Sequence, residues 1–408
     1  MLLTLLLLAC PPTDEAADGG AGDGGGSDGG GSDGGGTEVA RWNFLVFMNG
    51  DNNLESYVVH DLNELEEVGS GDGVNVLVQA DRIEGFDSRD GDWTGTRRYL
   101  VTQDSDPDRV GSTLLEDLGE RDLGDPAELA EFLDWASTEF PAERTVLILW
   151  DHGDSWALTS GVPQPPSISS DDSSGSIMSI AEGELTAALA PWVEAHGPLD
   201  LLGFDACLMA SWEVAHSLVG QADLMLGSEL SVGWEGFRYA PALASLRGDE
   251  ALSPEDLSRQ MVNDMVAEGT EWGETAIDLR RIDALSSAID ALAGLVLDDA
   301  AALVRLAGYL DQSRGCHKGW ERWYLDLGDL LDVIDANEGD SALATAAVQA
   351  RLALDESVLA VQGAGPYEWI TGLTIFSDTT GRRALGAYVE GSWAEDTRWD
   401  EVLWTQVE

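Results

Sequence analysis

Short apolar runs alternate with segments of helical spacing from residue 41 onward, and this alternation limits the chain to a small set of folds. Three of the runs are 42–49, 147–150 and 199–204. They are apolar nearly throughout, as is typical of strands buried on both faces of a parallel sheet. Helical spacing follows the first run, over 54–68. The pattern predicts an α/β fold with a mostly parallel central sheet and helices on both faces.

Two of the predicted strands lead into a reactive side chain. The run 147–150 is followed by His152, and the run 199–204 is followed by Cys207. Because the carboxyl ends of parallel strands meet at one edge of a sheet, we expect the two side chains to lie close together. A thiol beside an imidazole is the minimum needed for a thiolate nucleophile and its proton shuttle. The sequence therefore predicts a cysteine hydrolase.

The first 40 residues differ in composition from the rest of the chain. Residues 1–10 (MLLTLLLLAC) are too few to span a bilayer but have the length of an export-signal core, although no Lys or Arg precedes Arg41. Their end resembles a bacterial lipobox, which implies lipidation of Cys10. Residues 11–40 are rich in Gly, Ser and Asp and predict a disordered tether. We therefore expect an exported cell-envelope lipoprotein whose only membrane attachment is the lipid.

The chain is strongly acidic. Its 76 acidic and 21 basic residues give a formal charge of -55. This charge argues against binding to nucleic acid or to an anionic membrane surface, and it favours basic peptides as partners. An equally weighted alternative is that the acidity serves solubility or salt adaptation.

The chain beyond residue 250 is rich in predicted helix. We expect a core domain over 41–250 and a helix-rich extension over 251–408, in which 370–377 forms a late strand that returns to the sheet. The predicted helical segments of the extension are 255–268, 283–310 and 325–355.

Six motifs resemble those of clostripain-like cysteine peptidases, in the same order and at similar spacing. They are WNFLVFMNGDNNLE, LILWDHGDSW, DDSSGS, LDLLGFDACLMASWEVA, YLDLGDLLDVI and GLTIF. The resemblance is good over about residues 42–240 and weaker beyond them. It implies a caspase-like three-layer α/β sandwich and a cysteine endopeptidase.

The resemblance also implies roles for individual residues. His152 matches the catalytic histidine, Cys207 the nucleophile, and Asp205 the base of the pocket for the residue before the cleaved bond. A carboxylate there would select Arg or Lys, by a bidentate pair in the case of guanidinium. The backbone N–H groups of Gly153 and Cys207 are the candidate oxyanion donors. Asp205 could instead cap a helix that begins at Cys207.

Three further expectations concern the surroundings of these residues. A helix over 208–219 would place the sulfur at a helix N-terminus and lower its pKa. Asp151 stands where the family commonly has Asn, and its carboxylate would raise the pKa of His152. Trp156 matches a family Trp near the site, and a role in core packing is as probable.

The sequence requires no cofactor, but calcium is possible because some members of the family use it. Asp171 and Asp172 could supply oxygen ligands, or they could simply be solvated. Self-processing after a basic residue is not expected between the two motifs, since residues 153–206 contain no Lys or Arg.

Other interpretations remain open. The chain could be a catalytically silent lipoprotein that binds basic peptides in the same pocket, or a thiol hydrolase acting on a non-peptide ester or amide. A disulfide between Cys207 and Cys316 is less favoured than a free Cys207, because the two lie in dissimilar contexts. The pair Cys316 and His317 is interpreted as incidental, and the absence of a CxxC motif argues against structural zinc.

Overall fold

The computed structural model describes residues 39–156, 168–266, 273–315, 324–377, 386 and 388–407. They belong to one compact unit. The predictions for Cys10, for most of the tether and for Cys316 with His317 lie outside these residues. None of the described helices combines the length and the apolar character needed to cross a membrane.

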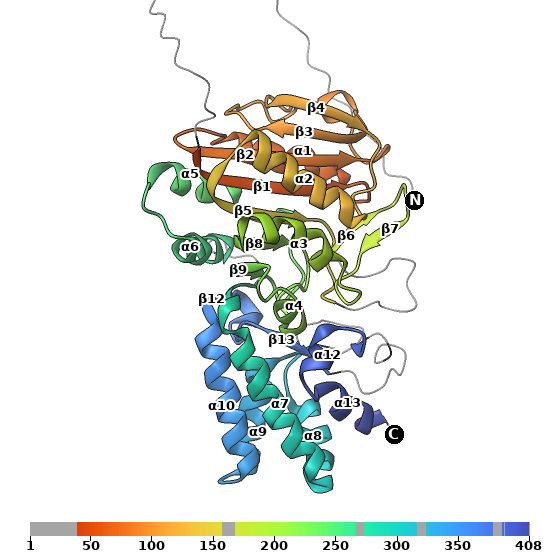
Figure 1. Ribbon diagram of the computed structural model, residues 1–408, viewed down its shortest axis with the longest axis vertical. Helices are drawn as coiled ribbons and strands as arrows, with labels where there is room; N and C mark the ends of the chain where they lie inside the picture. The colour runs from red at the N-terminus through yellow and green to blue at the C-terminus, as the bar shows by residue number, and fades with distance from the viewer. Residues whose placement is uncertain are drawn as a thin grey trace, which may run out of the picture. The chain divides into compact units, whose positions relative to one another are not determined.

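Nine of the described strands form one sheet, whose centre is parallel and whose edges are antiparallel. Their order is β12-β10-β9-β8-β5-β1-β2-β3-β4 (Figure 1). The parallel strands are β1 (Ala40–Gly50), β2 (Val74–Arg82), β5 (Ala142–Trp150), β8 (Leu199–Asp205) and β9 (Ala222–Gly227). The antiparallel strands are β3 (Gly95–Leu100), β4 (Thr113–Gly119), β10 (Gly273–Asp278) and β12 (Val358–Gly363). The predicted α/β fold class is confirmed.

Helices cover both faces of the sheet because its central strands are apolar on both sides. Leu45 and Phe47 of β1 pack in the same cluster as helices α2 and α3, whereas Phe44 and Val46 pack with α1, α5 and α6. The helices of these two layers are α1 (Glu55–Glu66), α2 (Pro126–Glu139), α3 (Glu184–His196), α5 (Tyr239–Gly248) and α6 (Pro254–Val266).

The remaining helices are short or follow β10, and two small sheets complete the described structure. The helices are α4 (Trp212–Ser217), α7 (Ile282–Asp298), α8 (Ala300–Gln312), α9 (Leu327–Glu338), α10 (Ala342–Ser357), α12 (Ser392–Asp396) and α13 (Trp399–Val407). The small sheets pair β6 (Ile168–Asp171) with β7 (Ser176–Met178), and β11 (Tyr324–Asp326) with β13 (Thr374–Phe376).

The late strand lies within the predicted range, but its predicted return to the central sheet is wrong. Residues 370–377 contain β13, which pairs with β11 instead of joining the central sheet. The strand that reaches the central sheet is β12, which pairs antiparallel with β10. The apolar run GLTIF marks a buried strand, but the run alone does not identify its pairing partner.

Candidate active site

The two strands that precede His152 and Cys207 are direct neighbours. β5 and β8 pair in parallel, and Trp150 lies opposite Asp205 at their carboxyl ends. His152 and Cys207 follow these two residues and line the same cavity of about 320 Å³. The structure therefore brings both candidate catalytic residues to one edge of the sheet, as the sequence predicts.

Two aromatic side chains, Tyr57 and Trp234, form part of the cavity lining. Trp234 is 61% exposed, and its ring stacks on Tyr57 with centroids 5.4 Å apart and planes 16° apart. The cavity is lined by Leu54, Tyr57, Trp150, Asp151, His152, Asp205, Ala206, Cys207, Ser231, Val232, Gly233, Trp234 and Gly236. A long side chain with an apolar stem can pack against such rings while its polar end reaches deeper.

Cys207 lies in a turn, so the prediction that it begins a helix is wrong. The next residue, Leu208, has φ +63°, a left-handed conformation that a right-handed helix excludes. Helix α4 begins only at Trp212, and the Ser211 hydroxyl caps it by accepting from Val214 N at 3.3 Å. The sulfur therefore lacks the helix N-terminus that would lower its pKa.

Cys207 forms no disulfide, and its thiol contacts the backbone of Val232. Val232 N donates to Sγ at 3.3 Å, and the thiol contacts Val232 O at 3.8 Å. Burial raises the pKa of Cys207 above its ordinary value. Cys207 therefore rests as a thiol near neutral pH and needs a base to become a nucleophile.

His152 is held by a residue that the sequence analysis did not identify. Its Nε2 lies 2.7 Å from Oδ1 of Asn53, which follows β1 at the same edge of the sheet. Burial lowers the pKa of His152 below its ordinary value, while the charge of Asp172 opposes this effect. The imidazole is therefore neutral near pH 7. Among the contacts of the described residues, no hydrogen bond joins His152 to Cys207.

The expectation that Asp151 raises the pKa of His152 is wrong. The Asp151 side chain is buried, and its carboxylate accepts from Asn52 Nδ2 at 2.7 Å and from Ser170 N. Burial raises the pKa of Asp151 itself to about 8, so this carboxyl carries little charge at neutral pH. Asp151 instead connects the β5 end to the loop that bears Asn53.

Asp205 forms part of the cavity wall and is only 5% exposed. Its Oδ2 accepts from Phe237 N at 2.9 Å and from the Tyr239 hydroxyl at 2.7 Å. Burial, with the charge of Asp61 adding, raises the pKa of Asp205 to about 7. No Lys or Arg in the described part of the chain forms an ion pair with it. Asp205 does not act as a helix cap, because no helix begins at Cys207.

Gly153 packs directly on the backbone of Cys207. A Cβ at this position would lie 2.5 Å from Cys207 O and 2.9 Å from Ala206 Cβ. Only glycine fits without displacing the turn. Trp156, by contrast, is fully buried and packs edge-on against Phe376, so its position is one of core packing.

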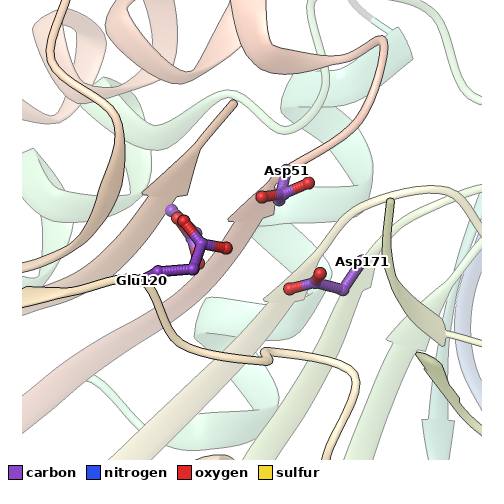
Figure 2. Close-up of side chains that lie close together, drawn as sticks. Asp51, Glu120 and Asp171 are labelled. Atoms are coloured by element: carbon purple, nitrogen blue, oxygen red, sulfur yellow. The ribbon is translucent and has the colours of Figure 1, made fainter. Parts of the chain in front are cut away.

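The two acidic candidates in the loop differ in position. Asp171 ends β6 and is 2% exposed. It belongs with Asp51, Asp81 and Glu120 to a group of four carboxylates, in which one oxygen atom of each lies within 4.8 Å of the others; Figure 2 shows three of these side chains. Asp172 is exposed and does not belong to that group.

Known proteins resemble this chain in sequence and in fold. The model of the Clostripain family (Peptidase C11) matches residues 46–404. Clostripain of Hathewaya histolytica is 25% identical over 228 residues, which are 52% of this chain and 43% of that protein. The match thus spans less than half of that relative.

Solved structures support the same fold. An inactive zymogen C11 protease from Parabacteroides distasonis has a TM-score of 0.66 at 18% identity, covering 88% of this chain and 99% of that chain. A secreted C11 cysteine protease from Bacteroides thetaiotaomicron, in complex with an irreversible peptide inhibitor, gives the same values. Since the family model covers nearly the whole described chain, this protein belongs to the clostripain family.

Proposed function

We propose that this protein is a cysteine endopeptidase that cleaves after Arg or Lys. The observation that carries the proposal is one cavity lined by Cys207, His152 and the carboxyl group of Asp205. Family membership supports the same chemistry. The test is hydrolysis of Arg and Lys reporter peptides by the purified protein under reducing conditions. Absence of thiol-dependent cleavage, with and without added calcium, would contradict the proposal.

The tautomer of His152 indicates which ring nitrogen acts as the base. Asn53 Oδ1 can only accept, so Nε2 carries the proton of the neutral ring and Nδ1 holds the free electron pair. Nδ1 takes the proton of the Cys207 thiol as sulfur attacks the peptide carbonyl. The imidazolium then protonates the departing amine, leaving a thioester. Water, deprotonated by the same nitrogen, hydrolyses the thioester and regenerates the thiol.

The negative charge on the carbonyl oxygen during attack needs nearby donors. We assign this role to the backbone N–H groups of Gly153 and Cys207, which lie on the two neighbouring strand ends. The observation that supports this assignment is the close packing of Gly153 on the Cys207 carbonyl. Donors fixed by such packing need no reorganisation when charge develops.

Replacement of Gly153 by alanine is expected to lower kcat by about 100-fold, because the added methyl group displaces the turn that carries the sulfur. Steady-state kinetics on an Arg reporter measure the loss. Gly308→Ala is the matched control, since Gly308 lies in α8 where only Gln312 Nε2 is near, at 4.0 Å. Equal kcat values for both variants would contradict the placement of Gly153.

The selection of basic side chains rests on Asp205, whose buried carboxyl group forms no ion pair with a Lys or Arg of the described chain. Asp61, Glu64 and Glu274 interact electrostatically with Asp205. Burial raises the pKa of Glu64 to about 7 and that of Glu274 well above its ordinary value. A guanidinium or ammonium group entering the cavity would favour ionised Asp205 and supply the missing counter-charge.

The pH dependence of kcat/KM is expected to report Asp205. Because its pKa is raised to about 7, the carboxyl is protonated below that pH and ionised above it, so kcat/KM for an Arg reporter rises through pH 7. In Asp205→Asn the acid limb should report the protonation of His152 instead. Because burial lowers the pKa of His152 from its ordinary value of 6.5, this limb should lie below pH 6.5. Identical acid limbs in both proteins would contradict the assignment.

We also propose that the protein is exported and anchored to the cell envelope through a lipid on Cys10. The support is the apolar stretch of residues 1–10 ending in Cys10 and the Gly/Ser/Asp composition of 11–40. A peptidase on such a tether would reach substrates beyond the membrane surface.

A further inference from the structure

A second cavity lies along helix α1, beside the one that contains Cys207. It has a volume of about 1010 Å³ and is lined by side chains of 60–67 in α1 and its C-cap, by the loop 103–107, and by Arg89, Glu235 and Arg238. We call this cavity the α1 groove. Helix α1 and the segment 231–238 contribute to the lining of both cavities.

The two cavities adjoin at the stacked rings of Tyr57 and Trp234, which line the cavity of Cys207. His60 lies three residues after Tyr57, hence on the same face of α1, and Glu235 directly follows Trp234. Both His60 and Glu235 line the α1 groove. A peptide that extends from Cys207 across the exposed Trp234 ring therefore enters the groove.

The far wall of the α1 groove is fixed to the helix by hydrogen bonds. Gln103 Nε2 donates to the carbonyl of Glu67 at 2.9 Å, and Asn63 Nδ2 donates to the carbonyl of Pro107 at 3.3 Å. The groove is thus formed before any ligand binds, so binding requires little ordering of the wall.

Acidic side chains outnumber basic ones in the α1 groove. The acids are Glu64, Glu67, Asp104 and Glu235, and the bases are Arg89, Arg238 and His60. Arg89 Nε contacts Asp87 Oδ2 at 2.6 Å, and His60 Nδ1 contacts Asp61 Oδ1 at 2.8 Å. Arg238 Nε lies 3.6 Å from Glu64 Oε1. Each base already has a carboxylate neighbour, so the remaining acids give the groove a negative potential.

Glu64 is a largely buried acid in the wall of the groove. Its side chain is 13% exposed, and its distance of 3.6 Å from Arg238 Nε is too long for a hydrogen bond. Burial, with the charge of Asp61 adding, raises the pKa of Glu64 to about 7 although Arg238 opposes this effect. A cation that enters the groove would favour the ionised carboxylate and be stabilised by it.

We propose that the α1 groove is a second subsite, which binds another basic side chain of the same substrate peptide. A helix rises about 1.5 Å per residue, so Glu64 and Glu67 lie about 10 and 15 Å along the axis from Tyr57. An extended peptide covers about 3.3 Å per residue, so the second basic residue stands about three to five residues from the cleaved position. This inference rests on the proposed function, and it makes peptides with two basic residues at that spacing the favoured substrates.

A series of reporter peptides tests the spacing. Each has Arg at the cleaved position and a second Arg at one other position, up to about eight residues away on either side, with norleucine there as the reference. The second Arg should raise kcat/KM about fivefold when it stands three to five residues away on one side, mainly through a lower KM. No gain at any position would overturn the proposal. An equal gain at eight residues would also overturn it, because it would reflect general attraction to an acidic protein.

Variants of the wall test which carboxylates bind the second Arg. Glu67→Gln and Glu64→Gln should each reduce the fivefold gain to about twofold or less. Glu67 is exposed, so Glu67→Gln should fold and keep the wild-type rate on the reporter with one Arg. Asp106→Asn is the matched control, since Asp106 is an exposed acid of the loop 103–107 that does not line the groove. A full gain in both groove variants, or an equal loss in Asp106→Asn, would overturn the proposal.

Binding to Cys207→Ala separates the groove from the proposed peptidase activity. By isothermal titration, the peptide with two Arg residues should bind about fivefold more tightly than the peptide with one, and adding Glu67→Gln should remove most of this difference. If this holds but the wild type cleaves neither peptide, the groove stands and the proposed peptidase function fails. If the wild type cleaves both peptides equally well and Cys207→Ala binds them equally, the peptidase function stands and the second subsite fails.

Discussion

Replacing Cys207 by alanine should lower kcat/KM for an Arg reporter peptide on the order of 10⁴-fold or more, because no other described group at the cavity can form the thioester. His152→Ala should cause a comparable loss. The thiol is buried and its pKa is raised, so without the imidazole it stays protonated. The double variant should be little worse than either single variant, since nucleophile and base act as a unit.

The controls for this prediction remove the same residue types elsewhere. Cys316→Ala and His196→Ala should keep wild-type rates; His196 is exposed at the end of α3 and does not line the cavity with Cys207. The measurement is steady-state kinetics, with circular dichroism to verify folding. Cleavage by a folded Cys207→Ala variant at the wild-type rate would exclude the proposed nucleophile.

Asp205→Asn should lower kcat/KM for Arg and Lys reporters about 100-fold or more, because truncating one partner of a buried charge pair costs about 2–5 kcal/mol. Cleavage of a reporter with norleucine at the same position should change little or improve. Asn keeps an oxygen that can accept from Phe237 N, so the local hydrogen bonding is largely retained. The result would appear as a change in the ratio of the two kcat/KM values.

Glu235→Gln is the matched control for Asp205. Glu235 is an exposed acid in the loop that also bears Trp234, and it does not line the cavity with Cys207. It should leave the Arg to norleucine ratio unchanged. A similar loss in both variants would attribute the preference to the general acidity of the protein, with its formal charge of -55.

The central architecture was predictable because the strands that carry the site are buried and apolar. The runs 147–150 and 199–204 each became a central strand, and parallel pairing brought their ends together. The start of α2 agrees with local propensities, since Pro126 stands in its first turn and the Asp125 side chain accepts from Ala127 N.

Features that depend on tertiary contacts were not predictable from these patterns. The segment after Cys207 is apolar enough for a helix, but Leu208 adopts a left-handed conformation and the helix starts at Trp212. The contact between Asn53 and His152 joins segments about 100 residues apart. The polar sequence after 42–49 at the same sheet edge was the available signal for Asn53.

The acidic group illustrates the same limit. Asp171 was recognised as a candidate ligand, but its three companions come from segments separated along the chain and not from a local motif. Asp172, adjacent in sequence, is exposed and does not belong to this group. Spacing in sequence therefore predicted one of the four carboxylates, and the sheet topology supplied the rest.

The most direct test of the central claim is covalent labelling with a chloromethyl ketone that carries an arginyl side chain, followed by mass spectrometry of the digested protein. The account predicts one label, on Cys207, formed much faster than with a norleucine analogue and slowed strongly in both Asp205→Asn and His152→Ala. A silent binding protein would take up no label, or would react at equal rates with both reagents. Either result, or modification of Cys316 in place of Cys207, would contradict the account.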